Sequence, residues 1–125
     1  MVNETDFIIA ARNYLEGLFP CYYEEAPTKG AFPYVVLNGI HTIPLSDGDL
    51  ASFYLDIWVD EKKEGATEEL ERICDTLRTE LDGAVIATPG IFASHIGFDS
   101  KSSLTDSEFD IAHRRLSLSA RIFYN

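Results

Sequence analysis

The chain has 125 residues, of which 46% are hydrophobic and 25% charged, so residues 1–125 can form a single domain with its own core. Its 21 acidic residues outnumber 10 basic ones and give a formal net charge of −11. This charge argues against a nucleic-acid groove as the main surface, because phosphate binding needs clustered lysine and arginine. It is typical of a soluble, self-repelling surface, of faces that meet a basic partner, or of a passage that does not retain DNA.

Hydropathy argues against a membrane span, and the charge of the first residues argues against a secretory signal. No apolar stretch approaches the roughly 18 residues that a membrane span needs. The first six residues, Met-Val-Asn-Glu-Thr-Asp, are acidic where a secretory signal would be basic. We therefore expect a protein that is made and used in a cytoplasm and has no membrane partner.

The first elements are a helix and a strand. Residues 4–18 predict an amphipathic helix, because apolar side chains recur there at three- and four-residue spacing and Pro20 stops it. A connection over 21–31 leads to an apolar run, 33–40, that predicts the first strand. Pro33 cannot donate to a ladder, so we expect it at the first residue of that strand or on a sheet edge.

A second strand is predicted at 52–60, after a turn at 44–49 that is rich in Ser, Asp and Gly. Its side chains alternate, so one face should pack on helices while the other stays partly wet or meets a partner. The side chains expected on the packed face are Phe53, Leu55, Ile57 and Val59. Those expected on the other face are Tyr54, Asp56, Trp58 and Asp60.

The second half of the chain predicts a helix and two more strands. A charged loop at 61–65 precedes a helix that begins near Thr67 as its cap and ends at Gly83. Strands are predicted at 92–98 and 111–124, joined by a long polar hairpin loop at 99–110. In the last strand the residues expected to face the core are Leu116, Leu118, Ala120 and Ile122, and those expected to face outward are Arg115, Ser117, Ser119 and Arg121.

These elements follow the order α-β-β-α-β-β and predict an α+β fold. We expect a mainly antiparallel sheet of about four strands with two helices on one face.

No catalytic, cofactor-binding or metal site is predicted. Cys21 and Cys74 form no metal-binding pattern and are interpreted as buried free thiols. His41, His95 and His113 lie far apart in the sequence and are assigned structural or surface roles. The sequence contains no Gly-x-Ser-x-Gly elbow, phosphate loop, dinucleotide fingerprint or His-Glu-x-x-His.

Two carboxylates and a tryptophan share the outer face of the second predicted strand. Asp56 and Asp60 flank Trp58, and paired carboxylates could do acid–base work because their repulsion raises one pKa. No nucleophile accompanies them, so we interpret both as solvated strand residues. Trp58 predicts either a subunit contact or packing under the long loop, and both alternatives stay open.

A basic cluster in this acidic chain gives the other candidate surface. Arg114, Arg115 and Arg121 could pair with acids of the 99–110 loop in a neighbouring copy, or could be outward residues of an exposed strand. The acids of that loop are Asp99, Asp106, Glu108 and Asp110. The candidate interface residues are therefore Trp58, Tyr54, Asp106, Glu108, Arg115 and Arg121.

Several segments together suggest a family. They are Leu18-Phe19-Pro20 at the end of the first helix, Ala31-Phe32-Pro33-Tyr34-Val35-Val36-Leu37, Ile57-Trp58-Val59, the helical segment Ile73-Cys74-Asp75-Thr76-Leu77-Arg78-Thr79-Glu80-Leu81, and Arg114-Arg115-Leu116-Ser117-Leu118. In these segments and in their order, nearly the whole chain resembles the tail terminator (tail completion, minor tail) proteins of long-tailed bacteriophages and prophages.

The resemblance implies a structural protein without enzymatic activity or cofactors. It implies a ring, of six copies, on the last ring of the tail tube, which stops tube polymerisation and offers a docking surface to the head while DNA passes through. The implied partners are other copies of the chain, the tail tube protein and the head–tail connector. The implied location is the tail or neck of the virion, after assembly in the cytoplasm of a bacterial host.

Two alternatives remain. One is a different head–tail joining protein of the phage neck. The other is a small α+β ligand-binding domain or enzyme, which would need a pocket lined by His95, His113 or the Asp56 and Asp60 pair.

Overall fold

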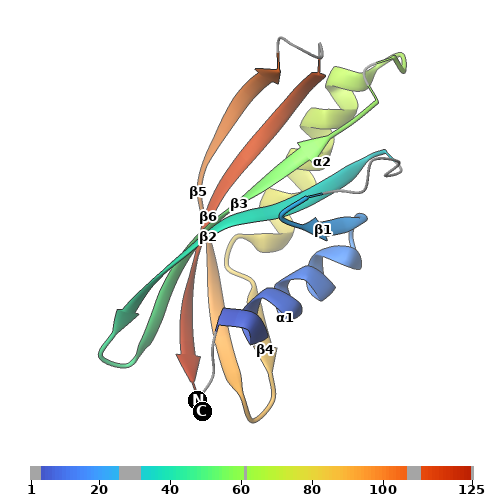
Figure 1. Cartoon of the computed structure of the whole chain (residues 1–125). Coiled ribbons are helices and arrows are strands. Elements are labelled where there is room, and N and C mark those ends of the chain that lie inside the picture. Colours follow the sequence, from blue (N-terminus) through green and yellow to red (C-terminus); the bar gives the residue numbers. More distant parts are fainter. Residues whose placement is uncertain (1–3, 26–31, 61, 107–110, 125) are drawn as a thin grey trace.

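The fold is a single six-stranded sheet with two helices. The computed structural model describes residues 4–25, 32–60, 62–106 and 111–124, of which 104–106, 111 and 112 are described by their backbone alone. Its elements in chain order are α1 (Glu4–Glu16), β1 (Cys21–Tyr23), β2 (Tyr34–Leu45), β3 (Gly48–Trp58), α2 (Ala66–Leu81), β4 (Val85–Thr88), β5 (Phe92–Asp106) and β6 (Ile111–Tyr124). The strands lie in the order β1-β2-β3-β6-β5-β4. Only β1 and β2 are parallel, and every other neighbouring pair is antiparallel (Figure 1).

Both helices lie on the same side of the sheet, but they cover different parts of it (Figure 1). The longer helix, α2, packs on the central strands β3, β6 and β5. The shorter helix, α1, contacts β1 and β4, which are the two opposite edges of the sheet. The sheet therefore curls around α1, which lies against both edge strands.

Phe7 anchors α1 inside this curl. Its ring meets the rings of Phe53 on β3 and Phe92 on β5 edge-on, at centroid distances of 5.8 and 6.3 Å. Edge-to-face geometry suits the aromatic quadrupoles. A buried phenylalanine contributes about 1.5–3 kcal/mol through the apolar surface that it removes from water.

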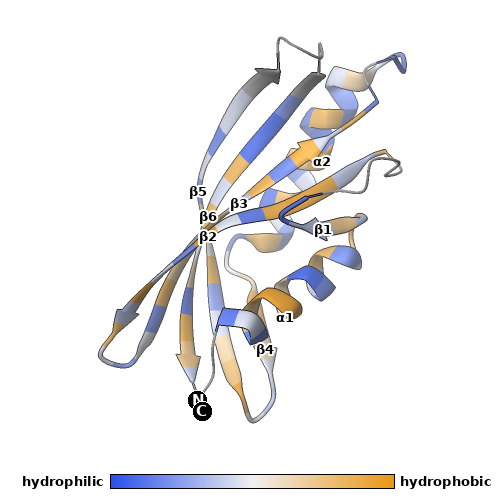
Figure 2. Cartoon of the chain, in the orientation of Figure 1, coloured by the Kyte–Doolittle hydropathy of each residue, from blue (hydrophilic) through white to orange (hydrophobic). Residues whose placement is uncertain are grey.

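The core follows the predicted alternation of the strands. All four residues expected on the packed face of the second strand, and all four expected to face the core from the last strand, are buried. Apolar and polar residues accordingly alternate along the strands (Figure 2). The apolar stripe of α2 completes the core with Leu70, Ile73, Cys74, Leu77 and Leu81.

The number of strands differs from the prediction. The sheet has six strands instead of about four, and the element order is α-β-β-β-α-β-β-β. The two additional strands are β1, in the segment predicted as a connection, and β4, which pairs with β5 across a short turn. With three and four residues, they are too short for a period-two pattern to be read from sequence.

The predicted turn and loop are also shorter than expected. Residues 44 and 45 continue β2, and residues 48 and 49 already belong to β3, so the turn is a tight hairpin. The prediction of a loop is wrong for 99–106, because these residues continue β5 and pair with β6. Residues 107–110 lie outside the described residues. Residues 99–103 are polar and exposed, which is the composition of a loop, so composition alone misassigns them.

The helix ends also deviate from the prediction. Helix α1 ends at Glu16, two residues early, and α2 begins after Gly65, which adopts a positive φ of 77° and provides no side-chain cap. The prediction of Thr67 as the cap is therefore wrong. Pro33 immediately precedes β2, in agreement with its predicted place at the start of the strand.

Candidate assembly interface

The side of the sheet opposite the helices is not covered by any element of the described ranges, and we call it the open face. Two groups of side chains mark its ends. The aromatic end consists of Tyr22, Phe32, Tyr34, Tyr54 and Trp58, and the arm end consists of Ile43, Leu50, Arg121 and Phe123. Between them lie small residues, namely Ser52, Gly97, Ser100, Ser117 and Ser119.

An ion pair with a buried carboxylate links β3 and β6 at the aromatic end. Arg115 Nε donates to Asp56 Oδ1 at 2.8 Å, and Arg115 Nη2 donates to Asp56 Oδ2 at 3.0 Å. Asn38 Nδ2 also donates to Oδ2, at 2.8 Å. These hydrogen bonds raise the pKa of the Arg115 guanidinium, which also lies 4.4 Å from the centroid of the Tyr54 ring. A bidentate pair of this kind fixes both side chains.

The interpretation of Asp56 as a solvated strand residue is therefore wrong. Asp56 is only 5% exposed, because strands on either side cover it and Arg115 and Asn38 satisfy its oxygens. Asp60 is exposed and accepts a hydrogen bond from the main-chain N–H of Lys62. The two carboxylates thus have separate environments and do not form a pair.

Trp58 packs against a neighbouring strand. Its ring stacks on His113 of β6 with centroids 3.9 Å apart and an angle of 18° between the planes. The two residues lie directly opposite each other in the β3–β6 register, which brings their side chains to the same face. Tyr34 continues the aromatic end, stacking on Phe32 and meeting Tyr22 edge-on. Whether Trp58 also contacts a subunit stays a prediction.

The structure separates the three arginines of the predicted basic cluster. Arg115 and Arg121 lie on the open face, whereas Arg114 points to the helix side and donates to Glu71 of α2 at 2.7 Å. Lys101 of β5 donates to the same carboxylate at 2.6 Å. Hydrogen bonds from Lys101 and Arg114 hold the pKa of Glu71 below its usual value.

The acids of the predicted loop are only partly described. Asp99 accepts a hydrogen bond from Ser119 Oγ at 3.3 Å on the open face. The backbone of Asp106 belongs to β5 opposite Ile111, but its side chain lies outside the described part of the structure, as do Glu108 and Asp110. Charge pairing between copies through these acids stays a prediction.

Apart from Arg121, the residues of the arm end were not predicted from the sequence as a surface. Ile43 and Leu50 lie opposite each other on β2 and β3 and are 45% and 36% exposed. Arg121 neighbours Leu50 across the strands, and Phe123 is two residues farther along β6. The Ser, Asp and Gly composition between these positions predicts a loose turn, which conceals a structured hairpin with apolar residues on one face.

The three histidines and the two cysteines, for which no metal site is predicted, do not come together in the structure. His41 and His95 are exposed, with His95 edge-on to Phe123, whereas His113 is buried against Trp58. Within the described residues, no group of three or more His, Cys, Asp or Glu side chains could hold a metal ion. Cys21 and Cys74 are buried free thiols, as predicted, and burial raises the pKa of each to about 11.

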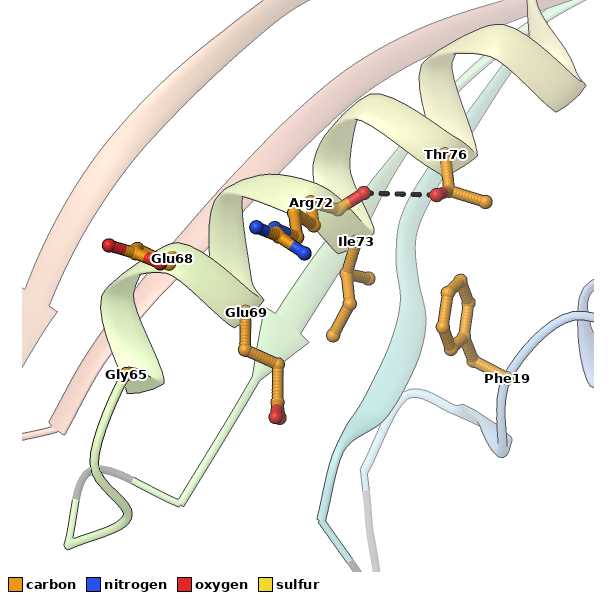
Figure 3. Close-up of a pocket in the computed structure, with 7 residues that line it drawn as sticks. All are labelled: Phe19, Gly65, Glu68, Glu69, Arg72, Ile73 and Thr76. Carbon is orange, nitrogen blue, oxygen red and sulfur yellow. Dashed lines mark hydrogen bonds between the residues drawn. The ribbon is translucent and has the colours of Figure 1, made fainter.

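The described pockets are shallow and lie on the helix side. One of about 440 Å³ lies between α2 and the corner after α1, with Phe19 and Ile73 as its apolar surface (Figure 3). Its other lining residues are Gly65, Glu68, Glu69, Arg72 and Thr76. The pocket that the enzyme alternative required is not among them, because neither the histidines nor Asp56 and Asp60 line any described pocket.

Neither described helix is long and apolar enough to cross a membrane. Comparison with curated proteins gives no match. Among solved structures, a chain of the "Virion of native gene transfer agent (GTA) particle" has the same fold, with a TM-score of 0.64 and 18% sequence identity. That similarity covers 91% of this chain and 85% of the other.

The sequence itself matches a family model. The model described as "Tail completion protein gp17" matches residues 10–123, from the middle of α1 to the end of β6. Nearly all of the sheet, the whole of α2 and the second half of α1 thus fall within the match. The chain belongs to the tail completion protein family, whose members are structural proteins of phage tails.

Proposed function

We propose that this protein terminates the phage tail. Copies of the chain, six by resemblance, form a ring on the last ring of the tail tube, stop its polymerisation and offer a docking surface to the head. The observation that carries this proposal is the family match over residues 10–123. The fold shared with a chain of a gene transfer agent virion supports a place in the virion.

The distribution of charge supports a ring with a channel. The helices contain eight acidic and three basic residues, a net charge of −5, whereas the strands contain four of each and are neutral. An acidic surface around a channel would let DNA pass without specific binding. Strands without net charge let identical copies approach each other with less repulsion than the acidic helices would.

The proposed partners follow from this role. One side of the ring binds the tail tube protein and the other binds the head–tail connector, in the tail or neck of a virion assembled in the host cytoplasm. Tyr54, Trp58, Arg115 and Arg121 on the open face belong to the proposed subunit or partner surface, with Asp106 and Glu108 at the far end of β5 and beyond it.

Deleting the gene from a phage or prophage that encodes it tests the function. We expect tails whose tubes lack a defined length and heads that carry no tail, both visible by electron microscopy and both restored by the wild-type gene. Tails of normal length joined to heads would contradict the proposal. Binding of the purified protein to tube ends, with no requirement for the connector, distinguishes a terminator from a head–tail joining protein.

A further inference from the structure

The hairpin formed by the end of β2 and the start of β3 projects beyond the helices (Figure 1). We call residues 42–52 the arm. It presents Ile43 and Leu50 as a directly opposed pair on the open face, where both side chains are substantially exposed. Two adjacent, exposed aliphatic side chains on a projecting hairpin form a compact apolar knob.

The arm is held in one position by contacts with the rest of the subunit. Arg121 Nη2 donates to Asp47 Oδ1 at 2.7 Å, Thr42 Oγ1 donates to Glu4 Oε2 at 2.8 Å, and the Tyr124 hydroxyl donates to Asp49. At Gly48, a Cβ would lie only 1.9 Å from the main-chain oxygen of Ile122, so the arm is pressed against β6. A fixed arm loses little conformational entropy when it binds.

A groove on another side of the molecule has an uncharged lining. It lies between α1 and β4, has a volume of about 420 Å³, and is lined by Ala10, Asn13, Tyr14, Val85, Ile86, Ala87 and Thr88. None of these seven residues is charged, although 25% of the chain is. Val85 is 54% exposed, and so is Ile9, which precedes Asn13 by one helical turn on the same side of α1.

The main chain near the groove also suits a projecting hairpin. Because β4 is the last strand of the sheet, half of its main-chain groups point away from β5. The arm contains two acids, Asp47 and Asp49, and Arg121 is paired with Asp47, so an uncharged groove is a surface that does not repel the arm. The exposed Glu80 adjoins the groove, where the Tyr14 hydroxyl donates to its main-chain oxygen at 3.3 Å.

We propose that the arm of one copy docks into the α1–β4 groove of the next copy. This proposal rests on the proposed ring, because a closed ring needs two different, complementary surfaces on each subunit. Between identical copies whose helices are net acidic, an uncharged groove is the part of the helical side that an apolar knob can approach without repulsion. The contact buries Ile43 and Leu50 and leaves the buried Asp56–Arg115 pair undisturbed.

Disulfide trapping tests the contact directly. We expect Ile43→Cys and Ala87→Cys proteins, when mixed and mildly oxidised with tail tube ends present, to form linked dimers that neither variant forms alone. The double variant should give a ladder of linked species that ends at the size of the ring. Thr67→Cys, exposed at the start of α2 and far from Glu80, is the matched control for Ala87→Cys, and the buried native thiols leave the background low.

Three results of the disulfide trapping would contradict the proposed contact. Linking of Ile43→Cys to itself, equal linking to Thr67→Cys, or no linking above that control would each overturn the proposal. A purified chain that caps tubes in the gene-deletion assay and yet gives one of these results leaves the tail function standing without the arm. If deleting the gene has no effect on tails, the proposed function fails, whatever the cross-links show.

A charge substitution gives a second readout. Leu50→Asp places an anion in an uncharged groove next to Glu80 and should weaken association by on the order of 30-fold or more, the loss expected for a central contact residue. Thr67→Asp is the control, because it adds the same charge on the exposed first turn of α2, away from both the open face and the groove. Thermal unfolding of both variants verifies that they are folded, and Leu50→Ser replaces Leu50→Asp if the latter is not. Equal association of the position-50 variant and the Thr67→Asp control would overturn the proposal.

Discussion

The two ends of the open face contain the same pair of residue types with opposite consequences. At the aromatic end, the Asp56–Arg115 pair is bidentate and its carboxylate is buried. At the arm end, the side chains of the Asp47–Arg121 pair are 60% and 41% exposed. A buried pair is costly to break, because the remaining charge stays desolvated, whereas an exposed pair contributes little.

This difference separates stability from assembly. The polar groups of the aromatic end are engaged within the subunit, with Trp58 stacked on His113 and Arg115 paired with Asp56. The arm end leaves Ile43 and Leu50 exposed next to a weak ion pair. Substitutions that break the Asp56–Arg115 pair should therefore lower stability, whereas substitutions of apolar arm residues should affect contacts between copies with little effect on stability.

The largest expected effect comes from forcing the arm off the sheet. Gly48 has a φ of 149°, and the Cβ of an alanine there would collide with the main-chain oxygen of Ile122. Gly48→Ala should lower the free energy of unfolding by about 2–5 kcal/mol, from backbone strain together with overpacking. Urea unfolding measures the loss.

Gly65→Ala is the matched control for this change. Gly65 also has a positive φ, of 77°, but a Cβ there meets nothing within 4 Å. Its substitution should cost only the backbone strain, about 1–2 kcal/mol. Equal losses at the two glycines would show that the contact of the arm with β6 does not restrain it.

The second prediction concerns the removal of the Asp56–Arg115 ion pair at the aromatic end. Asp56→Ala removes the acceptor of both Arg115 and Asn38, and should cost about 3 kcal/mol, the lower end for a broken buried pair because Arg115 is partly exposed. Asp47→Ala removes the corresponding acid from Arg121 and should cost less than about 1 kcal/mol. Chemical denaturation measures the loss of unfolding free energy in each variant. Similar losses in Asp56→Ala and Asp47→Ala would contradict the contrast between the two ends.

The third prediction concerns the hydroxyl that holds the arm. Burial and the neighbouring Asp49 carboxylate raise the pKa of Tyr124 to about 12, above the ordinary tyrosine value of 10.0. Because the folded pKa is raised, the stabilisation is complete below pH 10 and is lost as the pH rises from 10 to 12. Tyr124→Phe should cost about 1 kcal/mol at neutral pH.

The pH profile checks the assignment. The wild type should be more stable than Tyr124→Phe below pH 10, and this difference in stability should disappear between pH 10 and 12. Thermal unfolding across that range measures it. An advantage that persists above pH 12 would show that the ring of Tyr124, and not its hydroxyl, holds the arm.

Much of the core could be predicted from the sequence. Period-two alternation at 52–60 and 111–124, together with a 3.6-residue stripe on α2, identifies the buried residues because each pattern has one unambiguous core face. The strands β1 and β4 could not be predicted in this way, because they are held by their neighbours rather than by a pattern of their own. The family resemblance was confirmed by the match over residues 10–123.

The candidate site could be predicted less well. The sequence indicates which side chains point outward but not which partners they find across strands. Asp56 and Arg115 are 59 residues apart in sequence and meet only through the β3–β6 register. The same register separates Arg114 from Arg115 onto opposite faces, so three arginines that appear as one cluster in sequence have three different partners.

The smallest expected effect concerns the arginine on the helix side. Glu71 accepts hydrogen bonds from both Lys101 and Arg114, which lower its pKa from 4.5. The stabilisation is therefore present above pH 4.5 and is lost as the pH falls through the lower folded value. Because the carboxylate is 38% exposed, Glu71→Gln should cost only about 0.5 kcal/mol at neutral pH and nothing below the folded pKa.

The matched control is Glu69→Gln, which removes an acid paired with Lys63 alone. Acid unfolding monitored by circular dichroism should show a smaller difference from the wild type for this variant than for Glu71→Gln. If Glu71→Gln instead costs as much as Asp56→Ala, the pairs on the helix side contribute as much to the fold as the aromatic end does. The number of hydrogen bonds to the acid would then decide the strength of an ion pair in this sheet, and the contrast between buried and exposed pairs would no longer explain the two ends of the open face.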